Sequence, residues 1–378
     1  MGGKQIRRPE HRRMTAGMRI GERILAVGPE PDWGNPTVRD DMEALGSTGT
    51  RSAIEGADVG HSPPKGAARP SSIPIFSDCI IAESLQEDFM KKLYFSIACV
   101  FLFSHATLAP AQSNATYSSD HFKNQVAAIA TGTNTSERAA AITRRLDELG
   151  VKYRLQPFTD KDKRGANIIA ELPGAGAQKL VLGAHYDRVV AGQGAIDNAS
   201  GSAVVLELLA TLRTKPLKNY TVTVIFFDLE EAGLLGSKAQ VAVDQGRRLP
   251  NIYINFDVFG YGDTLWVMSS EGDSPSAKAI KQAASDSKFA IEIGPDYPPG
   301  DHLSFLKANV ETVSISLIAG EEINPILKIF KGDRSDRPPR ILTIIHSAGD
   351  TPDKIDGAAV VRALPVVEQA IRYIDASR

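Results

Sequence analysis

The stretch from Val181 to Gly201 constrains what this 378-residue chain can fold into more than any other. The apolar run 179–184 is typical of a buried parallel strand, and it delivers His185 and Asp187 at its carboxyl end. Asp197 follows just ahead of a strongly apolar segment that predicts a helix. Sites in open α/β sheets form at the carboxyl ends of strands. Taken alone, the stretch is equally compatible with a histidine in a turn beside solvated acids, so the rest of the chain has to decide.

Strands and helices alternate along the chain from residue 136 onward. The predicted strands are 151–158, 167–172, 179–184, 221–227, 251–256, 264–268, 311–318 and 341–345. The predicted helices are 136–149, 202–212, 234–245, 274–287, 301–308 and 357–374. The polar segment 324–340, with two consecutive prolines, predicts a loop. This alternation predicts an α/β fold, a single domain with a mixed, mostly parallel sheet and helices on both faces.

The first 111 residues differ from the rest of the chain. Residues 1–89 show no sustained hydrophobic period and include a stretch rich in Pro, Ser and Gly, which predicts either disorder or a non-native upstream extension. Residues 90–111 begin with Met-Lys-Lys, continue as an apolar run and end in Ala-Pro-Ala, the plan of a secretory signal peptide. We therefore expect translation to start at Met90 and the mature domain, residues 112–378, to be secreted or periplasmic.

Composition narrows the classes of partner. The formal net charge is −2, so nothing suggests binding to nucleic acid or, in the mature form, to a membrane surface. A hydrophobic content of 42% is enough for a sizeable core. Both cysteines, Cys79 and Cys99, precede the predicted domain, so neither a disulfide framework nor a cysteine metal site is available within it. The sequence makes no prediction of oligomeric state.

Charged residues gather where four predicted strands end. Those strands are followed by His185 and Asp187, by Asp228, Glu230 and Glu231, by Asp257, and by His346, while Asp197 lies in an intervening loop. Two imidazoles and three carboxylates suit zinc, with manganese or cobalt as substitutes. Five ligands, His185, Asp197, Glu231, Asp257 and His346, are too many for one tetrahedral ion but fit two ions if one carboxylate bridges them. Glu230 is then a carboxylate beside the metals that is free to act as a general base.

At this point the chain resembles a known family. The segments GAHYD, DNASG, FFDLEEAGLLGS, NFDVFG, GDHLSFL and IHSAGDTPDKID occur in order between residues 183 and 356. They are similar to motifs of the two-zinc peptidases typified by secreted bacterial leucyl-type aminopeptidases, whose relatives include glutamate carboxypeptidases and glutaminyl cyclases. The likeness spans about residues 167–356 and, loosely, the whole predicted domain. It implies the zinc-peptidase fold, which is phosphorylase/hydrolase-like.

The resemblance also implies roles for the residues. His185 and Asp257 would hold one zinc ion, and Glu231 and His346 would hold the other. Asp197 would bridge the two ions, and the peptide bond between Asp197 and Asn198 would be cis. Glu230 would be the general base, and the acid Asp187 would orient His185. Asp301 and His302 match a family Asp-His motif near the site, and whether they act directly is left open.

Two departures from the family pattern stand out. Some members carry a tyrosine immediately before the last histidine ligand, where it can stabilise the oxyanion, and here that residue is Ile345. Tyr253, Tyr261 and Tyr297 are alternative donors that the sequence does not rank. The cysteine pair that shapes the site in some members is also missing.

These observations predict a zinc-dependent aminopeptidase that acts on peptides with a free N-terminus and uses two Zn²⁺ ions. The first rival is a glutaminyl cyclase, which shares the fold but works with one zinc ion. A carboxypeptidase is a further rival, although those enzymes usually carry an extra domain. The last is a non-enzymatic binding module on the same fold. The intact set of five ligands and a base favours an enzyme over that module.

Overall fold

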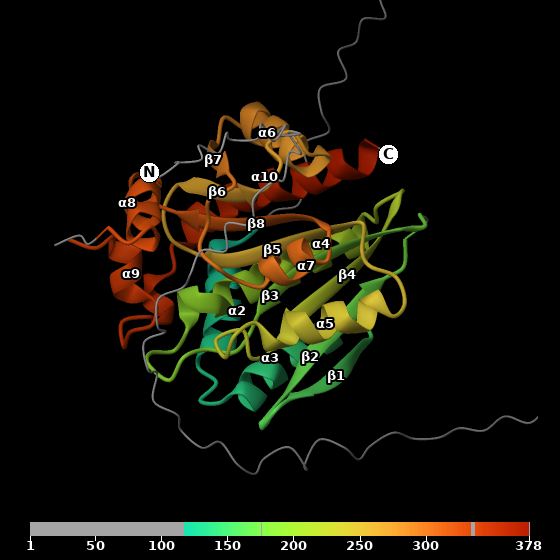
Figure 1. The fold of residues 1–378 in the computed structure, drawn as a ribbon, viewed down its shortest axis with the longest axis horizontal. Helices are drawn as coiled ribbons and strands as arrows, with labels where there is room; N and C mark the ends of the chain where they lie inside the picture. The colour runs from blue at the N-terminus through green and yellow to red at the C-terminus, as the bar shows by residue number, and fades with distance from the viewer. Residues whose placement is uncertain (1–116, 175, 334–336, 378) are drawn as a thin grey trace, which may run out of the picture. The chain divides into compact units, whose positions relative to one another are not determined.

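A computed structural model describes residues 117–174, 176–333 and 337–377 of the chain (Figure 1). Their strands form one eight-stranded sheet in the order β1-β2-β4-β3-β5-β8-β6-β7. The strands are β1 (Tyr153–Asp160), β2 (Lys163–Leu172), β3 (Gln178–His185), β4 (Tyr220–Phe227), β5 (Ile252–Phe259), β6 (Thr264–Ser269), β7 (Ala290–Gly294) and β8 (Glu311–Ile318).

The centre of the sheet is parallel. β3 pairs with β4 on one side and β5 on the other, and β5 pairs with β8, all in parallel. β1 and β2 form an antiparallel margin, and β6 joins the opposite side antiparallel to β8 with β7 parallel to it. β3 is buried from Leu180 to His185, as expected for a parallel strand covered on both faces. The predicted mixed, mostly parallel sheet is therefore confirmed.

Helices cover both faces of this sheet (Figure 1). The larger core cluster joins the sheet to α2, α3, α4 and α10, and a smaller cluster on the other face joins it to α5 and α7. The helices are α2 (Ser119–Ala130), α3 (Thr135–Glu148), α4 (Ser200–Thr214), α5 (Leu235–Gln245), α6 (Pro275–Asp286), α7 (His302–Lys307), α8 (Gly320–Phe330), α9 (Arg340–Ile344) and α10 (Gly357–Ala376), with short turns η1 (Ala195–Ala199) and η2 (Pro352–Lys354).

The helix that follows Asp197 lies at the centre of the larger core cluster. Its apolar residues Ala203, Val204, Leu208 and Leu212 are 0% exposed. Among the described residues, the segment Ala195–Thr214 has the length and apolar composition of a membrane-crossing helix, but 83% of its most apolar stretch is buried inside the fold. Because burial of apolar surface is the main stabilising term in folding, this helix anchors the loop that precedes it.

Two sequence predictions in the C-terminal third are wrong. Residues 324–330 of the segment 324–340, predicted as a loop, belong to α8, and 341–345, predicted as a strand, lies mostly in α9. The isoleucines explain both errors, because Ile323 and Ile326 are buried at helical spacing, as are Ile341 and Ile344. β-Branched residues favour strands only weakly, and packing against neighbours overrides that preference. The sequence also gave no prediction for α2 and β7.

The predictions for residues 1–89 and 90–111 lie outside the described residues. The predicted domain, 112–378, is described from Tyr117 onward.

Candidate metal centre

The carboxyl ends of β3, β4 and β5 bring the candidate residues together. β3 ends at His185, whose register partner on β4 is Phe227, so the loop holding Glu230 and Glu231 begins beside it. Asp257 lies within β5, near its carboxyl end, rather than after it. His346 follows α9, so the prediction that it follows a strand is wrong. Parallel pairing places three of these four segments at one edge of the sheet.

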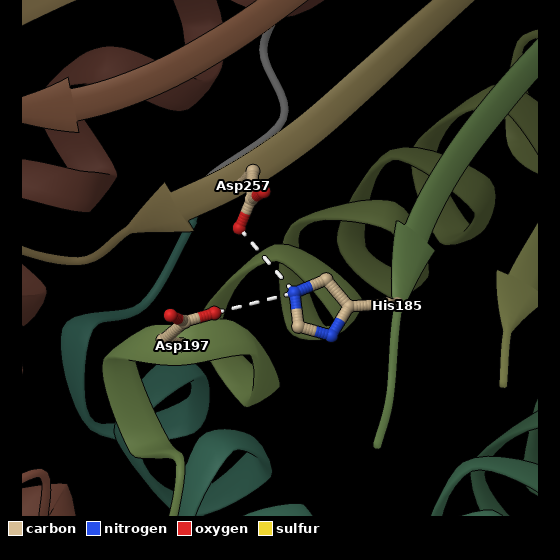
Figure 2. A group of neighbouring side chains, drawn as sticks. All are labelled: His185, Asp197 and Asp257. Atoms are coloured by element: carbon tan, nitrogen blue, oxygen red, sulfur yellow. Dashed lines mark ion pairs between the residues drawn. The ribbon is translucent and has the colours of Figure 1, made fainter. Parts of the chain in front are cut away.

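His185 faces two carboxylates with one ring nitrogen. Its Nε2 lies 3.2 Å from Asp197 Oδ1 and 3.5 Å from Asp257 Oδ1 (Figure 2). The other ring nitrogen, Nδ1, lies 3.4 Å from Asp187 Oδ1. All four side chains are less than one-fifth exposed. Asp187 is thus placed to orient the imidazole while Nε2 points into the cluster.

His346 faces the other oxygen of Asp197. Its Nε2 lies 3.1 Å from Asp197 Oδ2 and 3.3 Å from Glu231 Oε2. Asp197 therefore presents one oxygen to each histidine, which is the geometry of a carboxylate that bridges two ions. The peptide bond between Asp197 and Asn198 is cis, as the resemblance implies.

The donor set fits two divalent cations. Donor atoms lie within 4.8 Å of one another in three overlapping groups: His185 with Asp197 and Asp257, His185 with Glu230 and Glu231, and Asp197 with Glu231 and His346. Within the described part of the chain, Glu231 Oε1 and Asp257 Oδ1 are buried and make no hydrogen bond, and Asp257 Oδ1 lies 3.5 Å from His185 Nε2. A buried carboxylate oxygen without a donor is costly unless a cation compensates it. Nitrogen and oxygen donors in this mixture suit zinc.

The protonation of the cluster shows how strongly its members interact. Burial alone would raise the pKa of Asp197, but hydrogen bonds from His185 and His346 outweigh burial and lower it below its usual value. The bonds to Asp197 and Glu231 raise the pKa of His346 to about 11. Burial raises the pKa values of Glu231 and Asp257. In the absence of metal, shared protons between the histidines and the carboxylates stabilise the cluster. A cation that binds here displaces those protons.

The loop after β4 is held by Asp187. Its Oδ1 accepts the backbone N–H of Glu230 at 3.0 Å, and its Oδ2 accepts that of Glu231 at 3.2 Å. Burial raises the pKa of Glu230 well above its ordinary value. Asp228 lies outside the donor groups, because its carboxylate accepts the backbone N–H groups of Ala166 and Leu229. One carboxylate thus orients His185 and also positions the predicted base and a predicted ligand.

Of the three alternative tyrosines, only Tyr297 lines the hollow in front of the cluster. Its hydroxyl is hydrogen-bonded to Ser316, which in turn donates to the backbone carbonyl of Asp257. Tyr253 is buried and donates to Asn255 Oδ1 at 2.6 Å, and Tyr261 lies under the guanidinium group of Arg340. The structure therefore aims neither Tyr253 nor Tyr261 into the hollow.

Asp301 and His302 are both buried close to the centre. Asp301 is 1% exposed, and neither of its carboxylate oxygens makes a hydrogen bond within the described residues. Burial raises its pKa to about 7, partly offset by the nearby charge of His185 and hydroxyl of Ser237. Burial also lowers the pKa of His302 to about 4, and its ring packs edge-on against Tyr297. Neither residue belongs to the donor groups.

One residue that sequence reasoning missed is Asp350, which lies inside the last family motif. Its Oδ1 accepts the backbone N–H of Ile196 at 2.7 Å, and its Oδ2 accepts that of Asp197 at 3.1 Å. It is 1% exposed, and burial raises its pKa to about 6, so it is mostly ionised at neutral pH. Its place in the segment HSAGD was the only signal available in the sequence. Asp350 thus holds the backbone at Asp197, the predicted bridging residue.

We expect Asp350→Asn to destabilise the protein by about 1–3 kcal/mol, because an amide can accept only one of the two buried N–H groups and turns its NH₂ group toward the other. Thermal unfolding followed by circular dichroism should show a Tm lower by several degrees. Asp353→Asn is the matched control, because that side chain is exposed. Equal Tm values for the two variants would contradict the role assigned to Asp350.

A hollow opens in front of the metal centre. All five predicted ligands and Glu230 line it, and its remaining walls are mostly apolar. The apolar walls come largely from β6, β8, α8 and α9, and include Trp266, Ile318, Ile326, Phe330, Ile341, Leu342 and Ile345. Residues of α8 and α9, within the two segments whose secondary structure was predicted wrongly, therefore build one side of the hollow.

Two histidines and three carboxylates gathered beside the carboxyl edge of an α/β sheet are typical of metal-dependent hydrolases. The model of peptidase family M28 matches residues 167–371, more than half of the chain, and the chain belongs to that family. The resemblance inferred from the sequence is confirmed. The matched region contains all five predicted ligands, Glu230 and Asp187.

Individual relatives agree with the family match. The chain is 30% identical over 215 residues to leucine aminopeptidase 2 of Trichophyton equinum, covering 51% of this chain and 41% of that protein. It is 38% identical over 122 residues to leupeptin-inactivating enzyme 1 of Streptomyces exfoliatus, covering 31% of this chain and 27% of that protein. The chain thus spans about half or less of the length of the curated relatives it matches.

Solved structures share the fold. The aminopeptidase from Aneurinibacillus sp. strain AM-1 matches with a TM-score of 0.55 at 15% identity, over 69% of this chain and 94% of that one. The glutaminyl cyclase of Porphyromonas gingivalis matches with a TM-score of 0.54 at 20% identity, over 70% of this chain and 100% of that one. At these identities the likeness establishes the fold, which aminopeptidases and cyclases share.

Proposed function

We propose that this chain is an aminopeptidase that hydrolyses the first peptide bond of peptides with a free N-terminus, using two zinc ions. The observation that carries the proposal is the position of Asp197, whose two oxygens face His185 at 3.2 Å and His346 at 3.1 Å. Each of the two histidines also has a second carboxylate beside it, Asp257 for His185 and Glu231 for His346. This arrangement offers ligands to two cations, with Asp197 between them. Leucine aminopeptidase 2 of Trichophyton equinum, at 30% identity, supports the aminopeptidase assignment.

Each predicted residue has a task in such a reaction. His185 and Asp257 would hold one zinc ion, Glu231 and His346 the other, and Asp197 both. Bound there, the ions supply Lewis-acid chemistry, polarising the scissile carbonyl and lowering the pKa of the attacking water. Glu230 accepts a proton from that water and returns it to the leaving amine. The carboxylate of Asp187 keeps Glu230 in place by accepting a hydrogen bond from the backbone N–H of Glu230.

The walls of the hollow favour an apolar N-terminal residue. Phe330, Leu342 and Ile345 offer apolar surface to a side chain that enters beside the metal centre. Burial of a leucine-sized or phenylalanine-sized side chain contributes about 1.5–3 kcal/mol to binding. We therefore propose that the enzyme prefers large apolar residues at the N-terminus of its substrates.

A glutaminyl cyclase is the second candidate, and one observation keeps it in view. The Porphyromonas gingivalis cyclase aligns over its whole length with this chain. A cyclase needs one zinc ion, whereas here His185 and Asp257 complete the donors for a second. That second set of donors favours the peptidase.

Chelation and a substrate panel test the proposed function. We expect the zinc-loaded protein to release the chromophore from leucyl and phenylalanyl p-nitroanilides faster than from glutamyl or lysyl analogues. A strong chelator should abolish hydrolysis and added zinc should restore it, because the metal ions supply the electrophile. Turnover should accompany about two zinc ions per chain. Full hydrolysis in a verified metal-free sample, or cyclisation of glutaminyl peptides without peptidase activity, would overturn the proposal.

We further propose that residues 90–111 act as a signal peptide and that the enzyme works outside the cytoplasm. The basic head, apolar run and small residues of this segment support the proposal. N-terminal sequencing of the natively exported protein should find a start near Gln112. A mature N-terminus upstream of Met90 would contradict it.

A further inference from the structure

Arg138, on α3, is a buried cation whose partners are backbone carbonyls. It is 0% exposed. Its Nε donates to the carbonyl of Tyr186 at 2.5 Å, and its two terminal nitrogens donate to those of Gln193 at 2.8 Å and Gly194 at 3.2 Å. Arginine is rarely buried to this extent unless its donors are satisfied. The planar fork of the guanidinium group satisfies three carbonyls that a shorter or apolar side chain would leave without donors.

Those carbonyls lie at the two ends of one loop. The loop 186–194 begins directly after His185 and includes Asp187, and it ends three residues before Asp197. It therefore joins a predicted ligand of one metal to the predicted bridge between both. Gln193 is additionally fixed from the other side, because its backbone N–H donates to the carbonyl of Asp350 at 2.9 Å. The distance between His185 and Asp197 thus depends on how this loop is held.

A second arginine holds the middle of the same loop. One terminal nitrogen of Arg188 donates to the carbonyls of Val189, Val190 and Gly192 at 2.8, 3.1 and 3.0 Å. The other donates at 3.0 Å to the carbonyl of Thr133, just before α3. Two guanidinium groups therefore bond to the loop backbone: that of Arg138 ties it to α3, and that of Arg188 ties it to the segment just before α3.

Charge gives a second reason for a cation at this place. Burial lowers the pKa of Arg138 to about 10, against the opposing effect of Asp187, Asp350 and Asp197, so it is still positively charged at neutral pH. These acids belong to or support the metal centre. A fixed positive charge beside them lowers the cost of gathering so many carboxylates in a buried place.

We propose that Arg138 is a positioning residue of the metal centre: by holding both ends of loop 186–194, it fixes His185 relative to Asp197 and so sets the zinc affinity of the site they share. The inference rests on the proposed two-zinc function, but it concerns the binding of the metal and not the substrate. Arg138 lies outside residues 167–371, the region matched by the family model. The segment 117–166 thus contributes to the site as well as to the core.

The test is the zinc affinity of Arg138→Lys and Arg138→Met, measured by competition with a chromogenic chelator in the absence of substrate. Partners that orient metal ligands are worth roughly 10- to 100-fold in metal affinity. We expect both variants to bind the more weakly held zinc ion at least about tenfold less tightly, because neither side chain can donate to all three carbonyls. Lysine keeps the charge and an ammonium group, so its effect should be smaller than that of methionine, but its N–H donors all belong to one nitrogen and cannot span both ends of the loop.

Two control variants on the same helix separate positioning from loss of stability. Arg145→Met removes a guanidinium group whose partners are Gln125, Glu148 and His121 rather than the loop. Ile142→Ala opens the buried core beneath α3 and lowers Tm. Both should bind zinc as the unmodified chain does at a temperature well below their Tm values. A loss of zinc affinity in Ile142→Ala equal to that in Arg138→Lys would overturn the proposal.

If Arg138→Met does not fold, Arg188→Met tests the same loop from a partly exposed position. It should weaken zinc binding in the same direction. Unchanged zinc affinity in both Arg138→Lys and Arg188→Met would overturn the proposal. Zinc affinity is measured without substrate. A chain that binds two zinc ions but cleaves no peptide would therefore contradict the proposed function, and the effect of the Arg138 variants on zinc affinity would still test the role of Arg138.

Discussion

Replacing Glu230 with glutamine is expected to leave both zinc ions bound and to lower kcat by at least about two orders of magnitude, because a positioned general base contributes roughly 10²–10⁴-fold. Glutamine keeps the size of the side chain and can still form hydrogen bonds, but it cannot accept a proton. The backbone contact from Asp187 to residue 230 is unaffected by the change, so the loop should keep its conformation.

Glu231 provides the matched comparison, because it is the same residue type one position later. Its Oε2 lies 3.3 Å from His346 Nε2, within the donor group that includes Asp197. Glu231→Gln should therefore lose one zinc ion at low zinc concentration and recover activity in part when zinc is added. The measurements are zinc content and kcat of both purified variants. Loss of a metal in Glu230→Gln, or nearly full activity in it, would show that the two roles are reversed or that the base lies elsewhere.

The second large effect is expected for Asp197→Ala, which should lose both zinc ions and with them all measurable hydrolysis. Asp197 faces His185 with one oxygen and His346 with the other, so both predicted metal positions depend on it. The remaining histidines and carboxylates would be left as two incomplete sets with too few ligands for tight binding.

His185→Ala is the informative comparison for the bridge. That variant removes the imidazole that faces Asp197 and Asp257, so the binding of one zinc ion should become weaker. Glu231 and His346 should still hold the other ion. Titration with zinc, followed by a chelator-based measurement of bound metal, should find about one ion in His185→Ala and none in Asp197→Ala at the same concentration. Two ions retained in Asp197→Ala would show that it does not bridge.

The core of the site was predictable because its chemistry follows directly from strand boundaries. β3 and β4 are apolar runs that stop at polar residues, and in a parallel sheet such ends meet at one edge. His185, Glu230 and Glu231 were predicted as site residues for that reason. The family motifs then implied how they divide into ligands, base and orienting acid.

The residues that sequence reasoning missed act on backbone rather than on metal or substrate. Arg138 appears in the sequence as one of several polar residues of an amphipathic helix, and nothing local marks it as buried. Asp350 was quoted within a motif, yet its two bonds run to the backbone of residues 196 and 197. Such contacts join segments far apart in the chain, so no spacing pattern records them.

Three residues with positive φ adjoin the site and add a further element that the sequence does not encode locally. Leu229, Val258 and His346 have φ values of 55°, 54° and 55°. Residues other than glycine are strained at positive φ. Such residues gather at functional sites, where the surrounding packing holds them in that conformation. Leu229 precedes Glu230, Val258 follows Asp257, and His346 is itself a predicted ligand.

The sequence by itself determined the fold class and the family, and it predicted which residues form the metal site, because hydrophobic periodicity and ordered motifs are properties of the chain alone. Only the tertiary structure decided that α8 and α9 are helices that line the hollow. It also decided that one oxygen of Asp197 faces His185 and the other faces His346. These features depend on which buried surfaces pack together and on how distant backbone segments are held. Packing and long-range hydrogen bonds override local preference, so they exist only once the whole domain has folded.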